Sequence, residues 1–282
     1  MESLPRSRVV TVVVAACLVS VAIAETKKEF RYTVSPDCNV SVDTQYGSIS
    51  VRPGTTNEVV VKATLQSDLA EVDNQQSGNR IQIFSHLFQG SDQQTGRIDY
   101  ELLVPPSATL SLRSSTGPLA VERLRGDLSL EGTDAVVDIH DVSNAHVHVN
   151  TMRGPITLTE VHDGHIELSS ISGDITMKSV TGPLVKANSG SGKISYDGDF
   201  SSGGDYKFTT HTGDITAIVP ASTSADFSAH SMLGKVRHDF PLQPRHTPLS
   251  FEEGRAFFGT VGKAGSAVVL RSFSGRIRLK QR

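Results

Sequence analysis

The chain has 282 residues, with 27 Lys or Arg against 30 Asp or Glu and a formal net charge of −3. This near balance argues against a nucleic-acid-binding protein, which carries a basic stripe. Aromatic residues make up only 6% of the chain and tryptophan is absent, so the core has to be built from Val, Ile, Leu and Ala in thin layers.

The first 24 residues are predicted to be an export signal. Basic Arg6 and Arg8 precede an apolar run over residues 9–24, which ends in an Ala-Ile-Ala cleavage site before Glu25. In the alternative, Val-Ala-Ala-Cys at residues 14–17 resembles a lipoprotein cleavage box, and Cys17 becomes a lipid-anchored N-terminus. Both cleavages predict an exported protein, in the periplasm, at the cell surface or secreted.

The mature chain is expected to contain no transmembrane helix, because no later stretch approaches the roughly 18 apolar residues that span a bilayer. Cleavage before Glu25 leaves 25 Lys and Arg against 29 Asp and Glu, a net charge of −4. It also leaves Cys38 without a disulfide partner, so the chain is not a disulfide scaffold.

Residues 25–106 contain short apolar alternations, such as those at residues 30–34, 59–65 and 98–104, separated by polar loops. Alternation with a period of two predicts β-strands. The spacing is less regular than in the rest of the chain. We therefore expect an N-terminal β segment that caps the following repeats and protects their edge from aggregation.

Residues 107–282 repeat a five-residue unit, Gly-x-apolar-x-apolar, which also occurs once earlier at Gly47. Between Gly154 and Gly192 the glycines are spaced by 10, 9, 9 and 10 residues, and later copies are spaced by 21, so two strands make one repeat of 19–21 residues. The glycines predicted to form turns in this region are Gly117, Gly126, Gly154, Gly164, Gly173, Gly182, Gly192, Gly213, Gly234 and Gly275.

A five-residue strand with one apolar face cannot bury that face alone, whereas stacked copies bury a continuous core. The repeat therefore predicts an all-β protein with a β-solenoid fold. Right-handed coils are favoured by the handedness of parallel crossovers. Glycine permits the sharp turns, and the Ser, Thr, Asn or Asp beside it bonds to the turn backbone. A β-sandwich is the alternative, but it gives no reason to repeat the same turn chemistry. Residues 238–264 are expected to be a loop insertion that folds over the end of the solenoid.

Several motifs together carry a resemblance to a known family. They are Phe-Arg-Tyr-Thr-Val at residues 30–34, Tyr-Glu-Leu-Leu-Val-Pro-Pro at 100–106, the serial Ser-x-x-Gly-Asp-Ile units, and the closing segment at 265–279. Through them the chain resembles the bacterial putative adhesin domain family, exported β-solenoid proteins of unknown function. The resemblance implies an exported or surface β-helix, and it supplies no catalytic residues to assign.

The Gly-Ser-Gly-Lys segment at residues 190–193 hints at a phosphate-binding loop. The pattern requires a glycine where Ala187 stands and a Ser or Thr where Ile194 stands, and no helix follows to direct its N-terminus at a phosphate. We therefore predict no nucleotide and no other cofactor.

The histidines offer one candidate metal or pH-sensitive surface. With coils of 19 residues, Asp127, His146 and His165 fall in one outward row. The row beside it contains Ser129, His148 and Glu167. Imidazole and carboxylate groups in this arrangement suit a surface metal site or a pH-sensitive patch. Outward faces of a solenoid also need polar side chains, and simple solvation explains the same residues, so no metal site is predicted.

Acidic residues are scattered among the turns, whereas a carbohydrate-cleaving β-helix needs them gathered in a groove. We therefore expect a non-enzymatic, adhesin-like binding or structural protein of the bacterial cell envelope. Its expected partners are an envelope or host polysaccharide or a surface protein, and not nucleic acid. The alternatives are an enzyme acting on envelope glycans and a periplasmic assembly or stress factor with no ligand.

Overall fold

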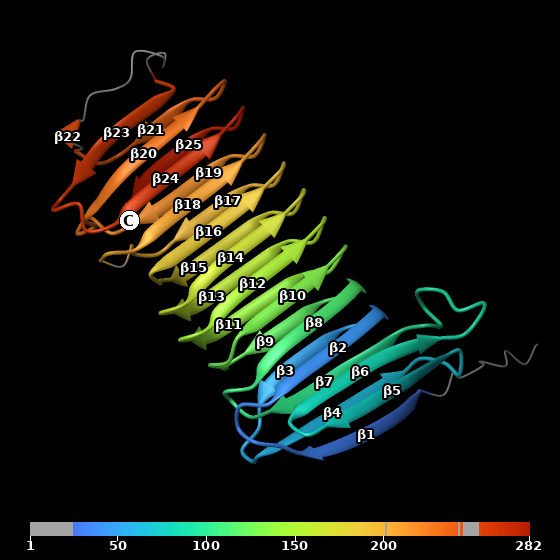
Figure 1. Ribbon diagram of the computed structural model, residues 1–282. Coiled ribbons are helices and arrows are strands. Elements are labelled where there is room, and N and C mark those ends of the chain that lie inside the picture. Colours follow the sequence, from blue (N-terminus) through green and yellow to red (C-terminus); the bar gives the residue numbers. More distant parts are fainter. Residues whose placement is uncertain (1–24, 201, 242, 245–253) are drawn as a thin grey trace, which may run out of the picture.

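The computed structural model describes residues 25–200, 202–241, 243–244 and 254–282. The expected export signal and Cys17 lie outside these residues, and so do residues 242 and 245–253 of the expected loop insertion, whereas residues 256–261 of that insertion form a strand. The described residues form β-strands and turns without a helix, so they contain no helix long and apolar enough to cross a membrane. The strands stack into two long sheets that run side by side along the molecule (Figure 1).

We call the two sheets A and B. Sheet A has twelve described strands, in the spatial order β1 (Thr26–Thr33), β4 (Glu58–Leu65), β7 (Ile98–Val104), β3 (Ile49–Pro53), β9 (Leu119–Glu122), β11 (Val137–Ser143), β13 (Ile156–His162), β15 (Ile175–Val180), β17 (Ile194–Asp197), β19 (Ile215–Val219), β25 (Ile277–Gln281) and β21 (Val236–His238).

Sheet B has thirteen described strands, in the spatial order β22 (Gln243–Pro244), β23 (Ala256–Val261), β20 (Ala225–Ser231), β24 (Ala267–Ser272), β18 (Asp205–Thr210), β16 (Leu184–Ser189), β14 (His165–Ser170), β12 (His146–Thr151), β10 (Leu128–Gly132), β8 (Thr109–Thr116), β2 (Asn39–Tyr46), β6 (Arg80–Leu87) and β5 (Ala70–Ser77).

Each coil consists of one strand of sheet B followed by one strand of sheet A, and equivalent strands of successive coils pair in parallel. Ile156 of β13 pairs with Ile175 of β15, and Ile166 of β14 pairs with Val185 of β16. Both pairs are separated by one repeat of 19 residues. The fold is therefore the β-solenoid that the glycine spacing predicts.

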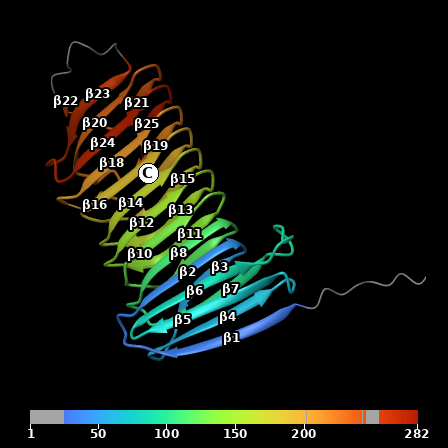
Figure 2. The ribbon, with the colours of Figure 1, turned by 45° about the vertical axis from the view of Figure 1, so that its right-hand side comes forward.

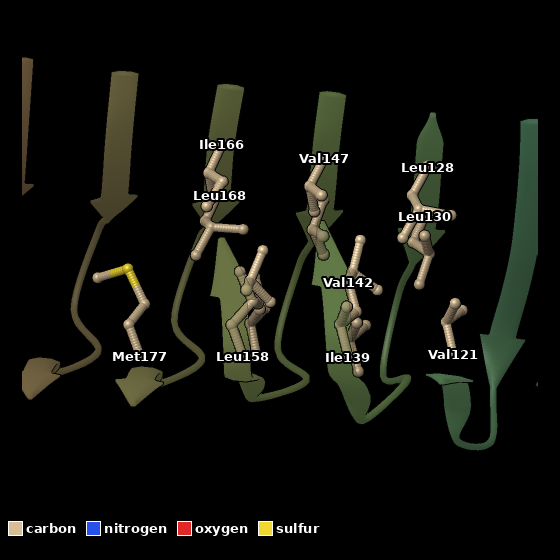
Figure 3. Close-up of a cluster of buried hydrophobic side chains, with 14 of the residues drawn as sticks. Val121, Leu128, Leu130, Ile139, Val142, Val147, Leu158, Ile166, Leu168 and Met177 are labelled. Atoms are coloured by element: carbon tan, nitrogen blue, oxygen red, sulfur yellow. The ribbon is translucent and has the colours of Figure 1, made fainter. Parts of the chain in front are cut away.

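The core lies between the two sheets and consists of the inward side chains of both. In β12 the residues alternate between exposed and buried, and Val147 and Val149 are almost completely buried. Figure 3 shows Val147 and Ile166 of sheet B opposite Ile139 and Leu158 of sheet A in this layer. Each such aliphatic side chain stabilises the fold by about 1.5–3 kcal/mol when it is fully buried.

The turn from sheet B to sheet A, which we call the B-to-A corner, brings the backbones of adjacent coils into close contact. A Cβ atom added to Gly173 would stand 2.1 Å from the carbonyl oxygen of Gly154, and one on Gly192 would stand 2.0 Å from that of Gly173. No side chain fits at such a distance. Stacking of the coils therefore requires glycine at Gly154, Gly173 and Gly192. Gly154 itself stacks on Ala135, the equivalent residue of the preceding coil.

A buried hydroxyl three residues before each of these glycines joins neighbouring coils. Ser189 Oγ accepts a hydrogen bond from Gly192 N at 2.9 Å and donates one to the carbonyl of Gly173, in the coil before, at 3.1 Å. Thr210 makes the equivalent pair of bonds with Gly213 and Gly192. The Ser-x-x-Gly pattern thus satisfies buried backbone groups within one coil and across to the next.

The order of the coils in space departs from the order in the chain at the C-terminal end. The last coil, β24 and β25, lies between the β18–β19 coil and the β20–β21 coil, as Figure 1 shows in red between orange strands. The glycine spacing placed Gly234 next to Gly213. In the structure Gly275 stacks on Gly213, and Gly234 stacks on Gly275.

The same departure occurs at the N-terminal end, where the β2–β3 coil lies between the β6–β7 coil and the β8–β9 coil. These strands pair in parallel with the rest, so the pairing shows no break at the expected boundary of residue 107. The antiparallel strands β1, β4 and β5 cover this end, and β23 and β22 lie antiparallel at the other end (Figure 2). Antiparallel additions shield the sheet edges from further pairing.

Candidate functional site

The histidine and acid rows lie on the outer face of sheet B. His146 pairs with His165, and their rings stack with centroids 4.8 Å apart and an interplanar angle of 8°. Asp127 lies one coil before His146, and its Oδ1 accepts a hydrogen bond from His146 N at 2.9 Å. The structure thus brings the three residues together, but the carboxylate of Asp127 is bound to backbone.

The neighbouring row contains Ser129, His148 and Glu167, which occupy paired positions on β10, β12 and β14. Glu167 Oε1 accepts a hydrogen bond from Lys186 Nζ at 3.0 Å, and its Oε2 lies 3.9 Å from His148 Nδ1. Lys186, and to a smaller extent His148, lowers the pKa of Glu167 below its ordinary value.

These contacts give the outer face of sheet B an exposed ionic row. Across the described ranges, no three or more His, Cys, Asp or Glu side chains form a group that could hold a metal ion. The arrangement supports charge pairing between coils.

The aspartates that follow corner glycines bind backbone, as expected, but it is the backbone of the neighbouring coil. Asp174 Oδ1 accepts a hydrogen bond from Lys193 N at 2.7 Å, and Asp214 Oδ1 accepts one from Arg276 N at 2.7 Å. Each carboxylate therefore reaches the next coil in space and binds the backbone of the equivalent position, as Asp127 also does. The usable sequence signal is Gly-Asp followed one coil later by Gly and a basic residue.

A cationic surface lies on the outer face of sheet A near the C-terminal end of the solenoid. It surrounds a hollow of about 350 Å³ whose lining includes five basic side chains and one carboxylate, that of Asp214. We call these five residues the cationic face: Lys235, Arg237, Arg276, Arg278 and Lys280.

Asp214 is already bound within this surface. Its Oδ2 accepts hydrogen bonds from Arg276 Nη2 at 2.7 Å and Nε at 3.1 Å. Partial burial opposes its ionisation, but the hydrogen bonds and positive charge of Arg276 hold the pKa of Asp214 below its ordinary value. The remaining four cations leave this surface strongly positive, although the whole chain is slightly acidic.

Sequence reasoning missed the cationic face because the expected loop over residues 238–264 interrupts the repeat, so the spacing does not give the register between the two coils that supply the residues. Lys235 and Arg237 belong to β21 and its corner, whereas Arg276, Arg278 and Lys280 belong to the last coil. The inverted coil order adds β19 to this surface, because it places β25 between β19 and β21. The one signal in the sequence for the cationic face was the alternation of basic and apolar residues in Arg-Ile-Arg-Leu-Lys at 276–280.

A third feature is a row of exposed apolar side chains along the B-to-A corners. It includes Met152, Ile171, Phe273 and Met232, which are between 43% and 61% exposed. The ring of His211 stacks on Phe273 with centroids 4.7 Å apart. A hollow of about 550 Å³ lies beside Gly190 in the same row.

Comparisons with known proteins cover most of the chain. None of the curated proteins matches the sequence. Among solved structures, a protein described as a putative adhesin from Bacteroides fragilis has 11% identity, with 91% of this chain and 98% of that chain covered and a TM-score of 0.48.

Two further structures match over a similar share of the chain. A putative adhesin from Parabacteroides merdae has 12% identity, covers 91% of this chain and 96% of its own, and has a TM-score of 0.46. A putative cell adhesion protein from Clostridium sporogenes has 13% identity and a TM-score of 0.32, and the match covers 91% of this chain and 100% of that chain. The model of the family Toastrack DUF4097, whose function is unknown, matches residues 38–280. The chain therefore belongs to the Toastrack DUF4097 family.

Proposed function

We propose that this protein is an exported, non-enzymatic, adhesin-like binding protein of the bacterial cell envelope. The observation that carries the proposal is the alignment of outward side chains into straight rows across successive coils. On sheet A one such row runs through Thr157, Thr176, Ser195 and Thr216, each paired with the next. Strands in a sheet are about 4.8 Å apart, so the hydroxyls repeat at that interval.

Rows of this kind suit a partner that is itself repetitive. A polysaccharide presents the same groups at regular intervals, and a solenoid can match them without rearranging. The coils are fixed by the buried hydroxyls and close glycine contacts, so little conformational entropy is lost when a partner binds. An envelope or host polysaccharide is therefore the proposed partner, and a surface protein is the second candidate.

The proposed location follows from the export pattern of residues 1–24. Mass spectrometry of the mature N-terminus tests it directly. A chain that begins at Glu25 supports free export, whereas a lipidated Cys17 supports an anchored form. An intact first residue, Met1, in cell fractions would contradict export.

The binding function is tested by applying the purified protein to a glycan array and, in parallel, by incubating it with envelope glycans and measuring bond cleavage. Retention on one class of glycan without cleavage is the expected result. Cleavage would replace the proposal by a glycan-active enzyme. Failure to retain any glycan or envelope component would favour an assembly or stress factor with no ligand.

A further inference from the structure

The cationic face joins five basic side chains on two neighbouring strands and their corners. Arg278 of β25 pairs directly with Arg237 of β21. Arg276 and Lys280 lie two residues to either side of Arg278, and Lys235 lies two residues before Arg237. Residues two apart in a strand point to the same side of a sheet, so all five side chains are on the outer face.

Most of this charge has no partner among the described residues. Arg276 is bound to Asp214. For the other four cations, no carboxylate within ion-pairing distance is found among the residues that the structure describes. The side chains of Lys235, Arg237 and Arg278 are exposed, and that of Lys280 is half-buried.

The pairing of Arg278 with Arg237 is unfavourable for the protein alone, because like charges directly opposite on neighbouring strands repel each other. Basic residues on an edge strand can protect it from aggregation, which would account for Arg237 of β21. That explanation does not extend to β25, which lies between β19 and β21 and has no free edge. A bound anion would neutralise both strands at once.

We propose that the cationic face binds an acidic polysaccharide through its carboxylate, sulfate or phosphate groups. This inference rests on the proposed binding function and names its ligand class. Guanidinium groups bind such anions with two parallel hydrogen bonds, and two of them side by side fit successive charges along one polymer chain. Thr216, which pairs with Arg278, adds a hydroxyl for a neutral part of the sugar.

The lining of the hollow favours a polysaccharide over two other polyanions. Single-stranded nucleic acids are held by aromatic side chains that stack on bases, and the lining contains none. Amphipathic segments that lie in a membrane surface insert apolar side chains into the lipid, and the isoleucines of this lining, Ile215 and Ile277, are buried.

The test is the affinity of the purified full chain for polygalacturonate, with neutral dextran as the reference polymer. The double variant Arg237→Thr with Arg278→Thr replaces both cations by the residue that the neighbouring coil carries at Thr216. The matched control, Lys178→Thr with Lys207→Thr, removes the same charge from exposed positions of β15 and β18 outside the hollow. We expect the affinity of the first variant for polygalacturonate to fall by at least about tenfold, because charged hydrogen bonds are lost. The control should bind as the original protein does.

Thermal unfolding separates loss of binding from loss of folding. Without polymer, the Arg237→Thr and Arg278→Thr variant should melt at the same temperature as the original protein or higher, because facing charges have been removed. Polygalacturonate should raise the melting temperature of the original protein and of the control, but not of this variant. The rise should shrink as salt screens the charges.

The outcomes separate the inference from the proposed function. Equal binding by both variants would overturn the cationic face as the site. Retention of neutral glycans only would overturn the inference and leave the proposed function standing, whereas retention of no glycan would overturn both. Tighter binding to duplex DNA or to phosphatidylglycerol vesicles than to polygalacturonate would overturn the choice of ligand.

Discussion

Gly275 lies directly against Gly213, and a Cβ atom added to Gly275 would stand 1.7 Å from the carbonyl oxygen of Gly213. The obstacle is backbone, so it cannot move aside as a flexible side chain would. This contact joins the last coil to a coil that precedes it by more than 60 residues in the chain, and it fixes how closely the two coils approach.

We expect Gly275→Ala to destabilise the protein by about 3 kcal/mol or more, because the backbone has to shift to admit the methyl group. The measurement is the free energy of unfolding in urea. Gly54→Ala is the matched control, since the nearest atom to a Cβ there is at 3.7 Å, an ordinary contact. That control should be neutral or slightly stabilising. Equal effects of the two substitutions would mean that the coils are not held at the described distance.

The buried hydroxyls can be tested at Ser189, which is 1% exposed. Ser189→Ala leaves the N–H of Gly192 and the carbonyl of Gly173 without this partner inside the core. We expect a loss of about 1–3 kcal/mol in the free energy of unfolding. Ser189→Thr keeps the hydroxyl, and Thr210 occupies the equivalent position of the next coil, so this variant should stay near the original stability. An alanine variant as stable as the threonine variant would show that the hydroxyl contributes little.

Asp99 gives the protein an acid-sensitive contact at its N-terminal end. Its Oδ1 accepts hydrogen bonds from Ser48 N at 2.8 Å and Ser48 Oγ at 2.6 Å, and its Oδ2 accepts one from Arg97 Nε at 2.8 Å. Partial burial opposes ionisation, but the hydrogen bonds from Arg97 and Ser48 hold the pKa of Asp99 below its ordinary value.

A carboxyl group with a lowered pKa in the folded state stabilises the protein above its unfolded pKa of about 3.9 and loses that contribution as the pH falls through the folded pKa. The Asp99 side chain is 21% exposed, so water screens part of the effect. We expect Asp99→Asn to cost about 1–2 kcal/mol at pH 7, and the difference from the original protein to vanish in strong acid. Unfolding curves between pH 7 and pH 2 measure it. A difference that is constant over this range would contradict the assignment.

The repeating part of the fold was predictable because each coil depends on local features. The alternation of polar Thr157 and apolar Leu158 shows which face of the strand is buried, and Gly154 before the strand marks the corner. The same pattern recurs 19 residues later and marks the next coil. The same arithmetic places His146 beside His165, and these residues are paired in the structure. This central stretch has no insertion, so chain order and spatial order agree.

The ends of the solenoid were not predictable from the repeat. A spacing of 21 residues separates Gly192 from Gly213 and also Gly213 from Gly234, yet the first pair stacks directly and the second does not. The spacing is the same because the intervening coil comes from the far end of the chain. The insertion is also what brings Asp214 and Thr216 of the β19 coil to the cationic face, a contact that chain order does not predict.

The inserted position of the last coil has a consequence for local stability. Chain termini usually fray, because few contacts hold them. Here β24 pairs with both β18 and β20, and β25 pairs with both β19 and β21. We expect the amides of the C-terminal coil, such as those of Leu270 and Leu279, to exchange with solvent deuterium as slowly as those of Leu158 and Leu168 in the middle of the solenoid.

The edge strand β21 should exchange faster than β25, although it lies earlier in the chain. Hydrogen–deuterium exchange followed by mass spectrometry measures both regions in one experiment, and the central coils serve as its internal control. Faster exchange in β25 than in β21 would mean that the last coil is not held between the two coils it joins.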